Sequence, residues 1–355
     1  LFLIGLSQWP DGRLLAGLSL GLIKSSSRSM LSLFQMKFIS RCAVGFLLTF
    51  LVACGADNQG ADGVAQSANK LVVYSARNEQ LIKPLFDRYT AETGIKIEYI
   101  TDKAGPLLQR LQAEGGSTPA DILLTVDAGN LWQAANQGLL KSIDSAALNE
   151  AVPAHLRDPD GQWFGLSIRA RTMVYNSKRV KPVELSGYQQ LADPKWKGRL
   201  CLRTSKKVYN QSLVAMLMAE YGEQATEAVI AGWVANLATE PFSNDTKAME
   251  AVAAGQCDVT IVNTYYFGRL QKKNPDTVLK IHWAGQSGSG THVNVSGIGV
   301  VKHSNNSVAA TALLEWLASA AAQQQFAGDN LEYPVNPAVE PVAAVKAWGE
   351  FKQNV

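Results

Sequence analysis

Two adjacent tyrosines, Tyr265 and Tyr266, have the most distinctive chemistry in this chain. An ionised phenol is a hard, anionic oxygen donor, which a small and highly charged cation prefers. Successive side chains of a strand point to opposite faces, so both phenols can serve one centre only where a strand gives way to a helix. The pair therefore indicates a cation site, with aromatic core packing as the alternative. Tyr74 and Tyr175 lie in strand patterns and are expected in the core.

The remaining residues that could do chemistry follow no known motif. The histidines at positions 155, 282, 292 and 303 show neither HxH nor HxxxH spacing, which argues against a zinc site. Residues 70–355 contain no GxSxG or HExxH sequence, so an exported hydrolase is the weaker alternative.

The N-terminal residues predict export. Residues 36–41 form a short segment with two basic residues, and the apolar run that follows at 43–51 is too short to cross a bilayer comfortably. Residues 36–53 are therefore interpreted as a signal peptide. The sequence LVACG at 51–55 resembles the lipobox of bacterial lipoproteins, which predicts lipidation of Cys54, with a soluble periplasmic protein as the alternative. Residues 1–35 are interpreted as an upstream artefact or extension, and 54–69 as a flexible tether.

Removing this leader changes the charge balance. The full chain has a formal net charge of +3, but positions 1–53 hold five basic residues and one acidic residue, so the rest has about −1. No block of Lys and Arg with interleaved aromatics occurs, so we expect no nucleic-acid partner. The length after residue 53 is sufficient for two lobes with their own cores.

Two cysteines remain besides Cys42 in the leader and the lipidation candidate Cys54. Cys201 and Cys257 each adjoin a strand-like run, and an exported protein meets an oxidising environment. A disulfide between them is our hypothesis, and two buried thiols are the alternative.

Alternating strand and helix patterns position these residues. Strands are predicted at 71–74, 95–100 and 121–125, with helices at 79–93 and 106–114, which is typical of an α/β sheet that binds ligands at the carboxyl ends of its strands. A second α/β unit follows, then a returning strand at 293–301 and helices at 309–326 and 341–352. We predict an N-terminal lobe of 70–168 with a return segment of about 293–318. The predicted C-terminal lobe is 169–292 with helices of about 319–355, and the two crossings form a hinge.

Eight short motifs carry a resemblance to a known family. They are VYSAR at 73–77, TPADI at 118–122, WFGLS at 163–167, DPKWKG at 193–198, VYNQSL at 208–213, NTYY at 263–266, GTHVN at 290–294 and EYPVN at 332–336. In this order and spacing, residues 70–350 resemble the ferric-ion-binding proteins of bacterial iron ABC importers. The resemblance implies the type II periplasmic-binding-protein fold, with two α/β lobes, a two-strand hinge and the ligand in the cleft.

The resemblance also implies a set of ligands. It places iron on Tyr209, Tyr265 and Tyr266, and places Arg77 and Asn78 where one subclass holds a synergistic carbonate. That subclass lacks the histidine or extra tyrosine that other members have in the first lobe. Glu79 departs from the pattern and is a possible additional ligand.

Three further residues are expected behind the ligands. They are Arg169, Arg171 and Asn263, and for the two arginines a structural salt bridge is an equal alternative.

The function implied is transport without catalysis. A monomer in the periplasm, held to the membrane only through its lipid anchor, would deliver Fe(III) to an inner-membrane ABC permease and its ATPase. The same fold with an organic or oxyanion ligand remains the alternative.

Overall fold

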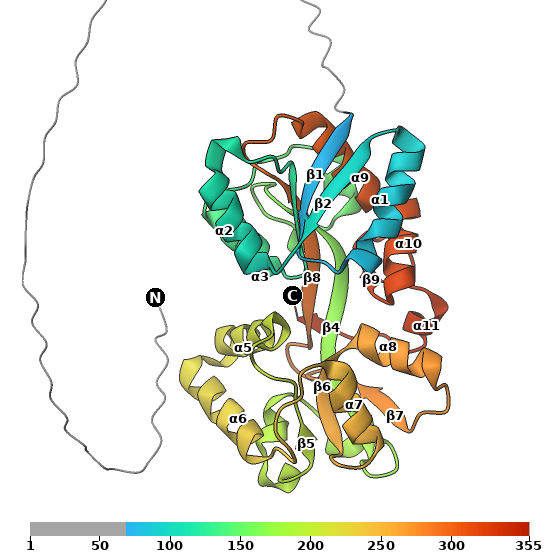
Figure 1. Ribbon diagram of the computed structural model, residues 1–355. Helices are drawn as coiled ribbons and strands as arrows, with labels where there is room; N and C mark the ends of the chain where they lie inside the picture. The colour runs from blue at the N-terminus through green and yellow to red at the C-terminus, as the bar shows by residue number, and fades with distance from the viewer. Residues whose placement is uncertain (1–68, 355) are drawn as a thin grey trace, which may run out of the picture. The chain divides into compact units, whose positions relative to one another are not determined.

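The computed structural model describes residues 69–354. The predicted signal peptide, the lipidation site at Cys54 and the tether up to residue 68 lie outside the described residues. No helix within residues 69–354 is long and apolar enough to cross a bilayer. These residues form two lobes that are joined by extended strands (Figure 1).

The first lobe opens with the predicted alternation of strands and helices. Its elements are β1 (Lys70–Ser75), α1 (Glu79–Thr93), β2 (Lys96–Thr101), α2 (Ala104–Glu114), β3 (Ile122–Thr125), α3 (Ala128–Asn136) and α4 (Ala146–Ala151). β1 pairs in parallel with β2 and with β3, as strands joined by crossover helices do. The apolar residues of α1 recur at helical spacing and are buried, and the helix ends at Gly94, whose φ of 76° favours glycine.

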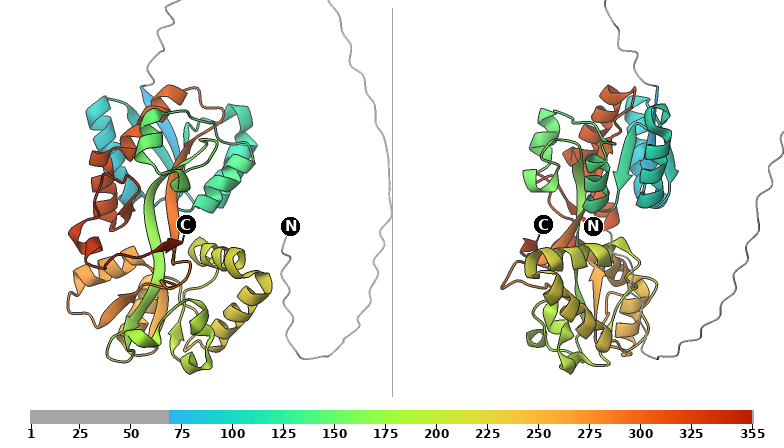
Figure 2. Two further views of the ribbon diagram at one scale, coloured as in Figure 1. Left: turned by 180° about the vertical axis from the view of Figure 1, so that it is seen from behind. Right: turned by 90° about the vertical axis from the view of Figure 1, so that its left-hand side faces the viewer.

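Two long strands belong to both lobes. β4 (Phe164–Asn176) and β8 (Thr291–Val300) are antiparallel neighbours, and every residue of both is buried. β8 pairs with β3 in the first lobe, whereas β4 continues to pair with β6 (Val259–Asn263) and β7 (Leu279–His282) in the second. The sheet order is β2-β1-β3-β8-β4-β6-β5, and Figure 2 shows both strands passing between the lobes.

The second lobe packs helices around the far end of β4. Its remaining elements are β5 (Leu200–Cys201), α5 (Val208–Tyr221), α6 (Glu223–Ala235), α7 (Asp245–Ala253) and α8 (Thr264–Lys273). Cys201 in β5 and Cys257 form a disulfide, with their Cα atoms 5.9 Å apart. β5 and β6 are parallel neighbours, which brings the two cysteines together.

The C-terminal helices correct our lobe assignment. The helix predicted at 309–326 is two helices, α9 (Ser307–Ala318) and α10 (Ala320–Asn330), because Ser319 is extended and its hydroxyl accepts from the Ala322 N–H. We expected residues after 318 in the second lobe, but α10 packs beside α1 in the first (Figure 1). Phe326 lies in the same core cluster as Ile82, because this apolar face completes the cover of the first sheet.

The last residues run back along the hinge. β9 (Tyr333–Pro334) pairs with β4, and β10 (Gln353–Asn354) pairs with the start of β8. The helix predicted at 341–352 is reduced to α11 (Ala343–Lys346), and Gly349 then adopts a φ of 85°. Trp348 reaches the second lobe, where its indole N–H donates to Gln271 of α8 at 3.1 Å.

Candidate metal centre

The tyrosine pair occupies the first turn of α8. β6 ends at Asn263 and α8 begins at the next residue, so Tyr265 and Tyr266 lie in helical rather than extended backbone. Their ring centroids are 4.3 Å apart, with an angle of 35° between the planes. Tyr265 is buried and Tyr266 is partly buried. The local geometry is therefore the one that lets neighbouring phenols share a centre.

Tyr209 joins the pair from another helix start. It is the second residue of α5, and all three tyrosines border one cavity of ≈ 60 Å³. The residues lining this cavity are Ala76, Arg77, Asn78, Leu81, Val126, Arg169, Tyr209, Tyr265, Tyr266, Arg269 and Glu332. Cavities that bind drug-sized organic ligands measure roughly 300–1,000 Å³, so this smaller cavity suits an ion with a small companion.

Arg171 fixes the two helix starts relative to each other. Its guanidinium donates to Asn210 Oδ1 at 2.6 Å and to Asn263 Oδ1 at 3.0 Å, and it forms a buried ion pair with Asp245 at 3.1 Å. Asn210 follows Tyr209, and Asn263 lies two residues before Tyr265. Arg171 is not among the residues that line the cavity, so it supports the tyrosines from behind.

Asn263 also touches the tyrosine pair directly. Its side-chain amide lies 3.4 Å from the Tyr265 hydroxyl and can donate to it. Its own backbone N–H donates to Asp245 Oδ2 at 3.2 Å. Asn263 therefore lies where its amide can act as a hydrogen-bond donor to the Tyr265 phenol.

Three further arginines lie beside the phenol rings. The guanidinium carbon of Arg169 is 5.7 Å from the Tyr209 ring centroid, that of Arg203 is 5.4 Å from the same centroid, and that of Arg269 is 5.1 Å from the Tyr265 centroid. Such cations favour ionised phenols. Sequence reasoning missed Arg203 and Arg269, although Arg269 could have been found from its position four residues after Tyr265 on one helix.

Tyr265 has the most perturbed phenol of the centre. Burial raises its pKa well above the ordinary value, and the neighbouring phenols of Tyr209 and Tyr266 raise it further. Arg169 acts in the opposite direction but does not offset these effects. The Tyr265 phenol is therefore protonated at neutral pH when no cation is present.

Arg77 is buried in an internal ion pair. Its Nη2 donates to Glu332 Oε1 at 2.8 Å and its Nη1 donates to Ser296 Oγ at 2.9 Å. The guanidinium also lies over the Phe326 ring, 4.4 Å from the centroid. The Arg77 guanidinium, which we expected to hold carbonate, is thus already hydrogen-bonded to protein atoms. Of its three nitrogens, only Nε lacks a partner within residues 69–354.

Glu79 and Asn78 have different placements. Glu79 is exposed, accepts a hydrogen bond from the Tyr99 hydroxyl at 2.8 Å, and does not line the cavity. The structure therefore does not bring this possible ligand to the tyrosines, because its side chain turns toward β2. Asn78 lines the cavity at the N-terminal end of α1.

The carboxylate that does line the cavity belongs to Glu332. It is buried, and its second oxygen accepts from the Ser167 hydroxyl. Glu332 is not among the site residues that the sequence predicts. No local pattern could have shown that it meets Arg77, since 255 positions separate them.

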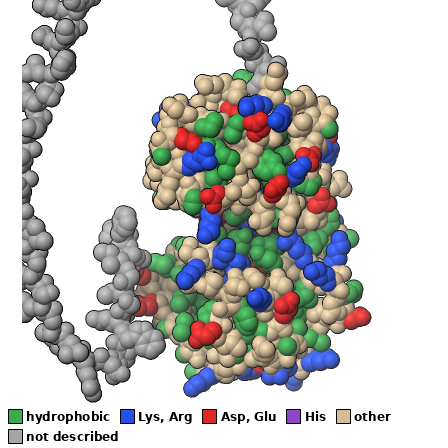
Figure 3. Space-filling view, in the orientation of Figure 1, with side chains coloured by type: hydrophobic (Ala, Val, Ile, Leu, Met, Phe, Trp, Pro, Cys, Tyr) green, Lys and Arg blue, Asp and Glu red, His purple; other side chains and the backbone are tan. Residues whose placement is uncertain are grey.

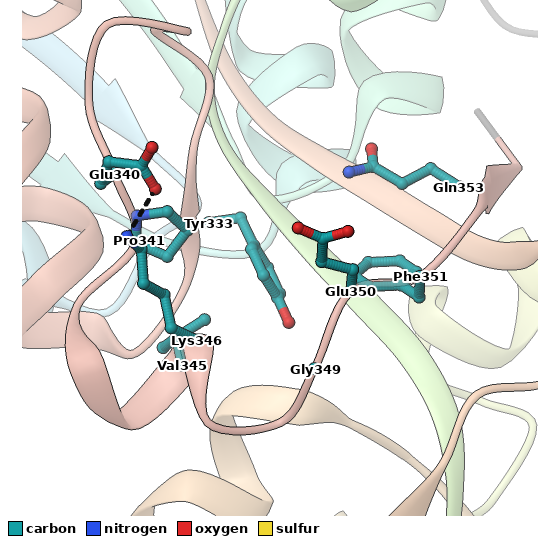
Figure 4. Close-up of a pocket in the computed structure, with 9 residues that line it drawn as sticks. All are labelled: Tyr333, Glu340, Pro341, Val345, Lys346, Gly349, Glu350, Phe351 and Gln353. Atoms are coloured by element: carbon teal, nitrogen blue, oxygen red, sulfur yellow. Dashed lines mark ion pairs between the residues drawn. The ribbon is translucent and has the colours of Figure 1, made fainter.

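A larger cavity is lined by none of the three tyrosines of the candidate site. It has ≈ 590 Å³ and borders the C-terminal segment between Tyr333 and Gln353 (Figure 4). Two of its charged side chains, Glu340 and Lys346, pair with each other at 2.9 Å. Burial raises the pKa of Tyr333, whose hydroxyl has no partner in the described part of the chain. These groups do not converge on one point, so the smaller cavity is the candidate site.

The donor set of the smaller cavity selects a particular type of cation. The described residues contain no group of three or more His, Cys, Asp or Glu that could hold a metal. Three phenols converge instead, and phenolates suit hard trivalent ions better than zinc or copper(I).

Comparison with known proteins decides the family. The family model described as bacterial extracellular solute-binding protein matches residues 74–324. This chain is a bacterial extracellular solute-binding protein.

Relatives of this solute-binding protein are named for iron. Iron uptake protein A1 of Synechocystis is 47% identical over 289 residues, covering 79% of this chain and 80% of that protein. A Trichodesmium protein solved in complex with iron and citrate ligands aligns with a TM-score of 0.75 at 42% identity, covering 80% and 92% of the two chains. The ferric iron-binding protein A of Mannheimia haemolytica, in an open conformation, gives 0.72 at 39% identity, covering 81% and 92%. These matches confirm the predicted family and the type II fold.

Proposed function

We propose that this solute-binding protein binds Fe(III) through the phenolates of Tyr209, Tyr265 and Tyr266. The observation that carries the proposal is that two helix starts bring three phenols to one cavity of ≈ 60 Å³. Three phenolates balance the charge of one ferric ion, and no other side-chain set in the cavity provides as many hard anionic oxygens. The iron named in the relatives' descriptions supports the same ion.

A small anion from solution completes the coordination in this proposal. The cavity is rich in guanidinium groups, and Asn78 places the N-terminal end of α1 beside it. Figure 3 shows Lys and Arg side chains gathered along the hollow between the lobes, which would attract an anion or an anionic iron chelate. Carbonate is the anion of our proposal, since it is small, planar and abundant.

The cellular role follows from the family. The protein would bind iron in the periplasm and pass it to an inner-membrane ABC permease with its ATPase, and it would catalyse no reaction. The lipid anchor at Cys54 and the monomeric state stay predictions. Mass spectrometry of the processed N-terminus would test the anchor, because a mature chain that starts elsewhere than at a diacylated Cys54 contradicts it.

One titration tests the iron proposal. Ferric citrate with bicarbonate is added to metal-free protein, and a visible phenolate-to-iron charge-transfer band is expected to grow to one equivalent. No band in protein whose circular dichroism is native would overturn the proposal. Calorimetric titration with phosphate in the absence of iron tests the oxyanion alternative, which requires tight binding without metal.

A further inference from the structure

Arg169 is a buried cation without a carboxylate partner. It lies on β4, where the strand leaves the first lobe, and only 2% of it is exposed. Its Nη2 donates to the carbonyl of Val126, and its Nε has no partner in the described part of the chain. Within residues 69–354 no Asp or Glu forms an ion pair with it, although it lines the tyrosine cavity.

The other buried arginines differ from Arg169 in this respect. Arg77 pairs with Glu332, while Arg171 and Arg203 both pair with Asp245. An unpaired buried charge is costly, and an arginine cannot escape the cost by losing its proton. The carboxylates of Glu332 and Asp127 act on Arg169 only from beyond ion-pair distance, so its charge is less fully compensated than that of the other three and an incoming anion would stabilise it.

Arg77 is the less suitable anion site. Its charge is already neutralised by Glu332, with 2.8 Å between donor and acceptor. A second anion at Arg77 would have to approach the Glu332 carboxylate or displace it from Arg77 and Ser167. Both routes oppose binding, because like charges repel strongly in a buried site. Glu332 also acts on Arg169, but from beyond ion-pair distance, whereas its ion pair with Arg77 is direct.

We propose that the anion accompanying the metal binds Arg169, and that Glu332 determines anion specificity by keeping Arg77 unavailable. This inference rests on the proposed ferric site. Because Glu332 pairs with Arg77, Arg169 is, among the described residues, the one guanidinium on the first-lobe side of the cavity without an ion-pair partner. A single guanidinium suits a small oxyanion of the carbonate class. A polycarboxylate would need a second guanidinium on this side of the cavity, and the Arg77–Glu332 pair withholds it; the other lining guanidinium, that of Arg269, comes from α8 in the second lobe.

The decisive experiment compares Arg169→Met with the double variant Arg77→Met/Glu332→Met. The double variant removes both members of the ion pair, so it leaves neither buried charge unpaired. Two readouts are followed against bicarbonate concentration: the melting temperature of metal-free protein and the charge-transfer band after iron addition. Arg169→Lys, which keeps the charge but loses the Nε donor, serves if Arg169→Met does not fold.

Opposite results are expected for the two sites. The double variant should still respond to bicarbonate in both readouts. In Arg169→Met the bicarbonate midpoint should rise by at least about tenfold, the equivalent of one charge-assisted hydrogen bond. Glu332→Gln should bind citrate more tightly than the wild type, since Arg77 becomes available.

Three outcomes would overturn the inference. A bicarbonate response that is lost in the double variant and kept in Arg169→Met places the anion at Arg77. An unchanged citrate affinity in Glu332→Gln removes its role in specificity. An anion response that survives in every variant excludes both arginines. None of these three outcomes contradicts the proposed Fe(III) site. That proposal fails separately if the wild-type protein gives no charge-transfer band.

Discussion

The phenol of Tyr265 neighbours those of Tyr209 and Tyr266, and its raised pKa results from burial first and from these neighbours second. A proton therefore occupies its oxygen at neutral pH in metal-free protein. A ferric ion can bind that oxygen only if it displaces the proton. Iron affinity and proton affinity are thus in direct competition at this residue.

Iron affinity should fall as pH falls. The folded-state pKa of Tyr265 is raised, so the phenol is protonated throughout the physiological range and each acid step adds to the competition. Iron addition in weakly buffered solution should release protons, and Tyr265→Phe should release one fewer per ion bound. Equal proton release in the two proteins would contradict a Tyr265 phenolate.

Each of the three tyrosines should be essential in a similar degree. Replacing Tyr209, Tyr265 or Tyr266 by Phe should lower iron affinity by more than about 100-fold, because the loss of a mere outer partner already costs roughly 10–100-fold. Competition with a coloured chelator measures the change. Tyr175→Phe is the matched control, since Tyr175 is a buried tyrosine of β4 outside the cavity, and its affinity should equal that of wild type.

At the scale of elements, α8 is held from both sides. Its first turn faces the cavity, and Gly268 on the same helix faces the C-terminal segment. A Cβ atom at Gly268 would lie 2.7 Å from Trp348 Cζ2 and 2.9 Å from Leu331 Cδ1. The close approach of Trp348 thus sets how deep α8 sits, and with it the position of the tyrosine pair.

Gly268→Ala should weaken both stability and iron binding. The added methyl group overpacks the contact with Trp348, so we expect a loss of about 1–3 kcal/mol in the free energy of unfolding and a lower iron affinity. Gly105→Ala in α2 is the control, because a Cβ there meets nothing within 4 Å. That change should stabilise by about 0.5–1 kcal/mol and leave the affinity as it is. Urea denaturation with iron titration separates the two effects.

Local patterns could predict the elements but not their distant contacts. The helix of Tyr89, the strand before Tyr265 and the helix starts at the tyrosines follow from periodicity and turn residues over a few positions. The position of α10 cannot be predicted from such patterns, because its apolar face could pack against either lobe. The Arg77–Glu332 ion pair could not be predicted either, since nothing in the sequence near Arg77 indicates a partner 255 positions away.

At the scale of the whole molecule, neither lobe is independent of the other. β4 and β8 are fully buried and contribute to the cores on both sides of the hinge. The loss of order in one lobe therefore exposes strands that the other needs.

Breaking the disulfide should show this coupling. Cys201 and Cys257 are 56 positions apart, and removing such a bridge costs about 2–5 kcal/mol. In Cys201→Ala/Cys257→Ala we expect a lower melting temperature in a single calorimetric transition, although the bridge lies in the second lobe alone. Two separated transitions would show that the lobes unfold independently.

The return of the chain to its first lobe also affects how the protein is made. β1 begins the described residues, but α10 and β9, which complete the cover of the same lobe, come near their end. The first lobe of a growing chain is therefore unfinished until residue 335 has been synthesised. For a protein with a predicted export signal, this delay preserves the unfolded form that a secretion channel accepts. In a chain stopped after β7, residues 70–168 of the first lobe should be digested by added protease, whereas they should resist in the full-length chain.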